Sequence, residues 1–320
     1  MSRSALTAAC LLAALPAGAE PVASGAARKA LTSAVALYQK ADFEAALKEF
    51  EKALTLSAGW KTALGHRAMC RWTLGDQTGA RADALAAAQL EPDGAQSWTA
   101  RGEARFVLKD YRSAAADFAE ALRLDPDLAD AHFGLGSAAG AAGDPAAARR
   151  HLDSALRINS EFATALLVRG TAYEKLQDFR SAIRDFGRAL DINPQIAWAH
   201  FSRGRCCYKI KDYRQSLLDL DEFLDEHPGS AEGLALRAKV HYLLQDYAGD
   251  EADLTRVIAL APDSGAAYAK RALAREHLGN HEGALSDLRK ALELEPGRRD
   301  QFQRAIAHIQ AGAAGAAPTP

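Results

Sequence analysis

Six arginines in this chain are each followed by an aspartate sixteen residues later. Guanidinium groups bind carboxylates or phosphates through two parallel hydrogen bonds, so two kinds of chemistry are open. The arginines could form a track that binds an anionic ligand, or they could form a ladder of internal ion pairs. A carboxylate at a fixed spacing from every arginine favours the internal ladder. The six pairs are Arg67 with Asp83, Arg101 with Asp117, Arg169 with Asp185, Arg203 with Asp219, Arg237 with Asp253 and Arg271 with Asp287.

No motif in the sequence predicts an active site. The sequence lacks a phosphate-binding loop, an H-E-x-x-H pair and a nucleophile elbow. The glycine-rich run 134–139 matches a dinucleotide fingerprint in its letters, but no strand precedes it. His277 and His281 have metal-ligand spacing, yet Gly279 and Asn280 interrupt a helix between them. We therefore predict a non-enzymatic protein with no cofactor and no metal site.

The cysteines do not indicate a disulfide scaffold. Cys70, Cys206 and Cys207 lie at positions where helices are expected, and neighbouring cysteines on a helix point about 100° apart. No C-x-x-C redox motif is formed. Buried free thiols are the expectation.

Two amphipathic helices are expected to position the arginines and aspartates, and the segment 163–194 contains the clearest pair. Apolar and small residues recur there at steps of three and four in each half. Asp178, between the halves, is suited to cap the second helix. Pro194 ends it, because proline disfavours helical geometry in the residue before it. The paired arginine and aspartate then lie at the same height of a helical hairpin.

This hairpin repeats every 34 residues. Pro92, Pro126, Pro194, Pro228, Pro262 and Pro296 share one register, with Ser160 in the skipped position. Such a period indicates a single elongated repeat domain rather than two globular ones. The eight repeats are 27–60, 61–94, 95–128, 129–162, 163–196, 197–230, 231–264 and 265–298.

Period, small residues and helix stops together resemble the tetratricopeptide repeat (TPR) family. In the third repeat this pattern is carried by Trp98, Gly102, Ala114, Phe118, Ala121 and Pro126. The resemblance implies an all-α TPR solenoid, a right-handed superhelix of eight helix-turn-helix repeats with a concave surface that binds a peptide or protein.

TPR-like packing implies that the second, fifth, ninth and twelfth residues of each first helix line the concave surface. These positions concentrate basic and aromatic side chains in repeats 6 and 7, with a smaller patch at Trp72 and Phe106. The alternative is that some of these aromatic residues only pack between neighbouring helices. The Lys/Asn carboxylate clamp of chaperone-binding TPR modules is not reproduced. The larger set is Trp198, Phe201, Arg205, Tyr208, Lys239 and Tyr242, with Lys209 beside them.

Both ends of the chain fall outside the repeats. Residues 1–19 have the basic start, short apolar stretch and A-x-A end of a signal peptide, and 20–26 follow as a linker. We expect export to a periplasmic, secreted or lumenal compartment; an organelle-targeting peptide or a cytoplasmic location is the alternative. Residues 299–310 are expected to form a capping helix, followed by a disordered tail over 311–320.

Composition bounds the partners. A formal net charge of −2 provides no basic field for nucleic acid or anionic lipid. No direct membrane insertion is expected after signal cleavage. The sequence therefore predicts an interaction scaffold or adaptor whose partner is a protein or peptide with apolar and acidic side chains. Two alternatives stay open: an exported co-chaperone or protease-delivery adaptor, and a purely structural component of an envelope assembly.

Overall fold

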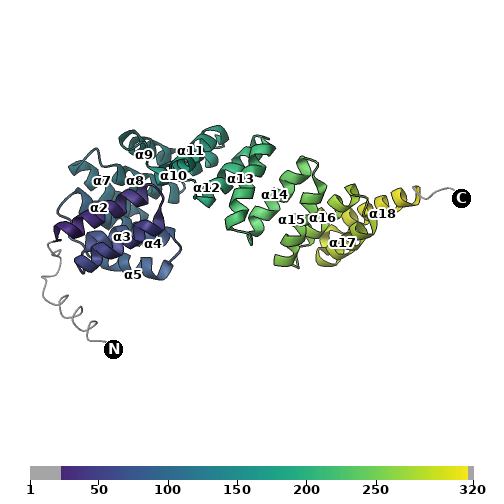
Figure 1. Cartoon of the computed structure of the whole chain (residues 1–320), viewed down its shortest axis with the longest axis horizontal. Coiled ribbons are helices and arrows are strands. Elements are labelled where there is room, and N and C mark those ends of the chain that lie inside the picture. Colours follow the sequence, from purple (N-terminus) through teal and green to yellow (C-terminus); the bar gives the residue numbers. More distant parts are fainter. Residues whose placement is uncertain (1–22, 316–320) are drawn as a thin grey trace, which may run out of the picture. The chain divides into compact units, whose positions relative to one another are not determined.

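The computed structural model describes residues 23–315, and all regular secondary structure in this range is helical. Figure 1 shows the helices in chain order. They divide into two compact bodies, which we call the N-terminal body (Met1–Ile196) and the C-terminal body (Ala197–Pro320).

The N-terminal body contains five helical pairs, one for each of the first five repeats. In each pair the first helix packs antiparallel against the second across a short turn. The helices are α2 (Gly25–Gln39), α3 (Phe43–Leu56), α4 (Lys61–Thr73), α5 (Gln77–Ala87), α6 (Ala95–Val107), α7 (Tyr111–Leu124), α8 (Ala129–Ala141), α9 (Pro145–Ile158), α10 (Ala163–Lys175) and α11 (Phe179–Ile192).

The C-terminal body contains three further pairs and a final helix. Its helices are α12 (Ala197–Lys209), α13 (Tyr213–Glu226), α14 (Ala231–Leu243), α15 (Tyr247–Leu260), α16 (Gly265–His277), α17 (His281–Leu294), the 3-10 turn η1 (Pro296–Arg298) and α18 (Arg299–Gly315).

The turn within each pair has a repeated chemical basis. A residue with positive φ stands two positions after the end of the first helix, and the second helix begins two positions later. Gln177, at φ 62°, is an example. Asp178 then accepts a hydrogen bond from the backbone N–H of Ser181, which the first helical turn leaves without an intrahelical partner. Aspartate caps the second helix in this way in repeats 1–7, and Asn280 does so in repeat 8.

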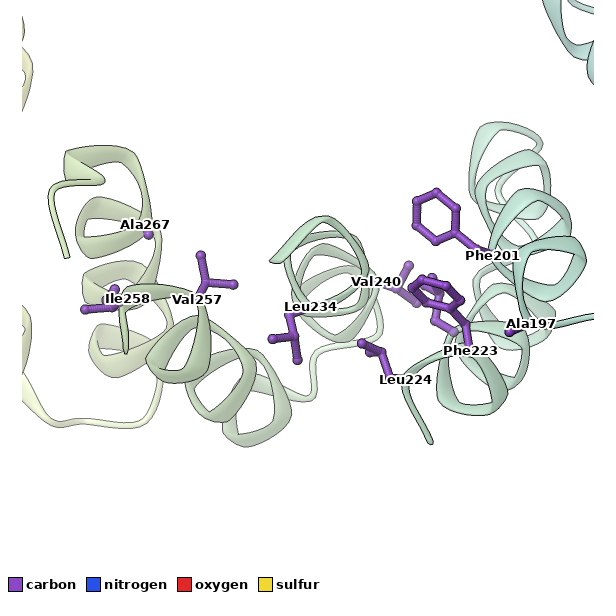
Figure 2. Packing of buried hydrophobic residues seen from close by; sticks show 10 residues of the cluster. Ala197, Phe201, Phe223, Leu224, Leu234, Val240, Val257, Ile258 and Ala267 are labelled. Atoms are coloured by element: carbon purple, nitrogen blue, oxygen red, sulfur yellow. The ribbon is translucent and has the colours of Figure 1, made fainter. Parts of the chain in front are cut away.

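The core of the C-terminal body is built from large apolar residues of successive pairs. Phe201 of α12 and Phe223 of α13 lie with ring centroids 4.8 Å apart, close to Val240 of α14 (Figure 2). Leu234 is fully buried in the same cluster. Further along, α18 buries Phe302 and Ile309 in the cluster that includes Leu288 of α17.

The N-terminal body is tightly curved at its second and third repeats. A Cβ atom added to Gly65 of α4 would overlap the backbone carbonyl of Ala100 in α6, so these two first helices approach each other closely. Later in the body, the end of α2 contacts α8 and α10 (Figure 1). The first helical pair therefore lies against the fourth and fifth as well as against the second.

The two ends of the repeat region differ from expectation. α2 begins at Gly25 because Ser24 accepts a hydrogen bond from the N–H of Ala27, so the expected linker is two residues shorter. α18 continues to Gly315, past residue 310, where the sequence analysis places the end of the capping helix. The expected signal peptide (1–19) and residues 316–320 lie outside the described residues.

Candidate protein-binding surface

All six arginine–aspartate pairs are present as two-point contacts between the paired helices. In each, the guanidinium Nε and Nη2 donate to the carboxylate. For Arg169 and Asp185 both distances are 2.7 Å. The aspartates are buried: Asp219, for example, is 1% exposed. These contacts neutralise carboxylates inside the helical pairs, so the arginines do not form an anion-binding track.

Several of these arginines also tie neighbouring repeats together. The Nη1 of Arg169 donates to Asp153 of the preceding second helix at 2.8 Å. Arg237 makes the same contact with Asp221, also at 2.8 Å. One planar guanidinium thus binds two helices of successive repeats, which sets the position of each first helix against the pair before it.

A second arginine of the first helix reaches the same aspartate in three repeats. Arg71 contacts Asp83 at 2.9 Å and Arg275 contacts Asp287 at 2.9 Å, and Arg105 contacts Asp117 at 2.7 Å. Sequence reasoning paired one arginine with each aspartate and missed this second one. Its signal was present: these arginines stand four residues after the first, on the same helical face.

The predicted surface of repeats 6 and 7 is centred on an exposed tryptophan. Trp198 is 58% exposed although its ring packs edge-on against Phe201 at 5.8 Å. Phe201 itself is only 3% exposed, which corrects its assignment to the partner-binding set. Phe201 packs in the core against Phe223, because the large Phe223 ring needs a neighbour that covers it.

Basic and aromatic side chains continue this surface from α12 to α14. The ammonium group of Lys239 lies over the ring of Tyr208, 4.8 Å from its centre, a cation–π contact between successive first helices. Arg205 lies 5.4 Å from the Phe201 ring and 3.9 Å from Glu232. Lys209 is exposed at the end of α12.

Tyr242 carries the surface toward α16. Its hydroxyl lies 3.4 Å from Nε2 of His277. The His277 ring stacks on Tyr247 with centroids 4.1 Å apart and planes only 6° apart. Sequence reasoning missed both residues. His277 was considered only as a metal ligand, and Tyr247 lies on α15, the second helix of its repeat. We define the binding face as Trp198, Arg205, Tyr208, Lys239 and Tyr242.

The smaller patch in the N-terminal body is less continuous. Trp72 is 44% exposed, and its ring contacts Phe106 edge-on at 5.6 Å. Phe106 is 6% exposed and packs against Tyr111. Burial therefore removes Phe106 from the surface, and Trp72 stays as a single exposed aromatic residue.

Corresponding first-helix positions are mostly buried in the N-terminal body. Met69, Glu103, Phe133 and Thr164 occupy the positions expected to line a concave surface, and each is less than 9% exposed. Curvature at Gly65 and the return of α2 onto α8 and α10 explain this burial. The same positional code therefore gives a covered face in one body and a more exposed face in the other.

Residues 23–315 contain no cluster of three or more His, Cys, Asp or Glu side chains arranged for a metal ion. Among the described helices, none combines the length and apolar character needed to span a membrane. Cys70, Cys206 and Cys207 are buried free thiols, as expected. Burial raises the pKa of Cys70 and of Cys207 to about 12, so these thiols stay protonated at neutral pH.

Family models for the tetratricopeptide repeat match most of the repeat region. One matches residues 99–163, 133–194, 167–231 and 209–264, and a second matches residues 265–298. No curated protein sequence matches the chain.

Solved structures with the same fold are distant in sequence. The Cut9–Hcn1 hetero-tetramer of the APC/C matches with a TM-score of 0.62 and 16% identity. The match covers 88% of this chain and 55% of the chain in that structure. YrrB, described as a TPR protein with an unusual peptide-binding site, matches with a TM-score of 0.54 and 19% identity over 57% of this chain and 94% of its own. PilF of Pseudomonas aeruginosa matches with a TM-score of 0.54 and 16% identity over 70% of this chain and 99% of its own. By its repeats and their family models, this chain belongs to the tetratricopeptide repeat family.

Proposed function

We propose that the protein is a non-enzymatic interaction scaffold that binds a protein or peptide segment on the binding face of its C-terminal body. The observation that carries the proposal is Trp198, a large aromatic side chain that is 58% exposed within a row of basic and aromatic residues. Exposed tryptophan, tyrosine and arginine side chains are the residue types that most often dominate binding energy at protein interfaces.

The chemistry of the face favours a partner with both apolar and acidic side chains. Trp198 offers an apolar surface, Arg205 brings positive charge beside the Phe201 ring, and Lys239 brings positive charge over the Tyr208 ring. Arg205, which is half-buried, lies 3.9 Å from the exposed Glu232. A segment with an aromatic or aliphatic anchor followed by an acidic residue fits this order.

A peptide selection on the full chain tests the proposal. A displayed library of random twelve-residue peptides is enriched on the wild-type protein and, in parallel, on the variant Leu218→Ala. Leu218 is 60% exposed on the second helix α13 and is not one of the residues that define the binding face, so it is the matched control. Peptides with apolar and acidic residues should be enriched equally on both proteins and lost on Lys239→Ala. Enrichment of basic peptides, or equal enrichment on Lys239→Ala, would contradict the proposal.

The wider role can be divided by a second experiment. The co-chaperone or protease-delivery role predicts that deletion of the gene changes the turnover of a client, whereas a purely structural role predicts that the binding face is covered in the assembled state. Hydrogen exchange at α12 and α14 in the native assembly distinguishes them, because only the structural role protects these helices permanently.

We also propose that residues 1–19 direct export, with the mature chain beginning at Glu20. N-terminal sequencing of the functional protein tests this directly. Intact Met1 in the functional pool would exclude cleavage.

A further inference from the structure

The last turn of α2 is held by side chains from four later segments of the N-terminal body. The amide of Gln39 donates to Asp130 of α8 at 2.8 Å and accepts from Asn159 at 3.0 Å. Thr164 of α10 donates its hydroxyl to the backbone carbonyl of Tyr38 at 2.7 Å. We call these contacts the α2 latch, together with the donation from Asn193 to the carbonyl of Ala41 at 3.2 Å.

The latch recognises a helix end by its backbone chemistry. The last carbonyls of a helix have no partner in a following helical turn; that of Tyr38 accepts from the N–H of Ala41 in the turn after α2, and Thr164 is its second donor. Thr164 and Asn193 supply such donors from residues 126 and 152 positions away in the sequence. The acceptors belong to the last turn of α2 and to the turn that follows it, so a helix that presents the same end and the same turn offers the same acceptors.

Latch contacts differ in character from the contacts that hold the rest of α2. Ala27, Ala30, Leu31 and Ala34 are buried along one side of the helix, which packs chiefly on α3. The latch consists of polar side chains, with one aromatic contact between Tyr38 and Phe133 at 6.5 Å. Polar contacts of this kind can exchange with water, so the latch can open while the apolar packing of α2 on α3 persists.

Beneath the latch lies a polar face that Tyr38 covers. His66 Nδ1 is 2.7 Å from Glu103 Oε2, and both residues are buried. Together with Met69, Tyr38 and Asp130 they line a small cavity. Burial raises the pKa of the Asp130 carboxyl, an indication that this face is shielded from water while α2 covers it. We define the inner face as His66, Glu103, Asp130, Phe133 and Thr164.

We propose that the α2–α3 pair occupies the inner face as an intramolecular ligand and withholds it from partners. When the latch opens, the inner face takes the C-terminal end of another helix that carries an aromatic residue and a glutamine in its last turn, as α2 carries Tyr38 and Gln39. This site is separate from the binding face of the C-terminal body and is tested without reference to it.

Hydrogen exchange on full-length variants tests the latch. Thr164→Val removes the hydroxyl donor at nearly constant shape. Asn193→Asp removes the amide donor but keeps the oxygen that accepts from the Gln195 N–H. The matched control is Thr171→Val, whose hydroxyl bonds only within α10, to Leu167.

Exchange over residues 25–56 should accelerate by up to about tenfold for each donor removed, while the Thr171→Val variant exchanges like the wild type. Unchanged exchange over 25–56 would overturn the proposal. So would equal acceleration over all of residues 25–192, because the first pair would then be an inseparable part of one cooperative unit.

A peptide added in trans tests the site itself. The probe is a fluorescent peptide with the sequence of residues 24–42. Gln39→Ala in the protein weakens the latch from the α2 side and leaves Thr164 and Asn193 intact, so this variant should bind the probe at least about tenfold more tightly than the wild type. Adding Thr164→Val to Gln39→Ala should remove that gain. If Gln39→Ala releases residues 25–56 in exchange but binds the probe no better than the wild type, the inner face is not a helix-binding site.

Discussion

The hydroxyl of Thr164 donates a hydrogen bond to the backbone carbonyl of Tyr38, which lies 126 residues earlier in the sequence. This bond joins the first and fifth repeats of the N-terminal body. The equivalent residue of repeat 6 in the C-terminal body, Trp198, is exposed instead. The position of Thr164 against Tyr38 therefore helps to explain why the face is covered in the N-terminal body.

Close approach of α4 and α6 at Gly65 should be essential for this curvature. Gly65→Ala places a methyl group against the carbonyl of Ala100, and we expect a loss of about 1–3 kcal/mol in the free energy of unfolding. Gly140→Ala is the matched control, because its added Cβ would lie 3.7 Å from Ala148, an ordinary contact. It should stabilise by about 0.5–1 kcal/mol through helix propensity. Urea unfolding of both variants measures the difference, and a stabilising Gly65→Ala would show that the helices do not meet as described.

Removal of the buried partner of Arg169 should lower the free energy of unfolding more than removal of its exposed partner. Asp185→Ala leaves the half-buried Arg169 without its main carboxylate and should cost about 3 kcal/mol. Asp153→Ala removes a partner that is 45% exposed and should cost under about 1 kcal/mol. A double-mutant cycle of Arg169→Ala and Asp185→Ala measures the coupling by thermal unfolding. Additive losses would mean that the pair contributes no interaction energy of its own.

Asp250 should make the C-terminal body less stable as pH rises. Asp250 occupies a buried position of repeat 7. The corresponding residue is Ser216 in repeat 6 and alanine in the other six repeats. Burial, and then the nearby Asp253, raise the pKa of Asp250 to about 7, above the value of about 4 for an unfolded chain. Folding therefore favours the protonated acid. Its stabilising contribution is present at about pH 4 and is lost as pH rises through 7.

Asp250→Ala removes this dependence. At pH 8 the variant should be more stable than the wild type by about 2 kcal/mol, and the difference should shrink by pH 5. Urea unfolding monitored by hydrogen exchange in α14–α16 is the measurement. A difference between the two proteins that is the same at pH 5 and pH 8 would show that Asp250 titrates normally. Asp246→Ala is unsuitable as a control, because Asp246 caps α15.

Local features of the fold could be predicted from the sequence because each depends on residues within one 34-residue repeat. The helix of repeat 5 begins at Ala163, where the period places it, and Asp178 caps its partner. The arginine–aspartate pairs follow from the same short-range geometry. Because the period is fixed, every repeat gives independent evidence for the same local structure.

Curvature could not be predicted in this way. It depends on how closely helices of different repeats approach, and Gly65 against Ala100 becomes informative only when the two helices are placed. The latch joins residues more than 90 positions apart. Burial of Phe201 had a readable signal, since Phe223 replaces the small residue found at its position in most repeats and needs a neighbour to cover it.

The affinity of one selected peptide for two tryptophan variants tests the central claim most directly. Trp198 and Trp72 are both exposed, but only Trp198 belongs to the binding face. Isothermal titration of the peptide enriched on the wild-type protein should show that Trp198→Ala weakens binding by about 1–3 kcal/mol, while Trp72→Ala changes it by less than about 0.5 kcal/mol. Both variants should unfold at the wild-type temperature. Loss of affinity in Trp72→Ala with wild-type affinity in Trp198→Ala would place the binding site in the N-terminal body and contradict the account.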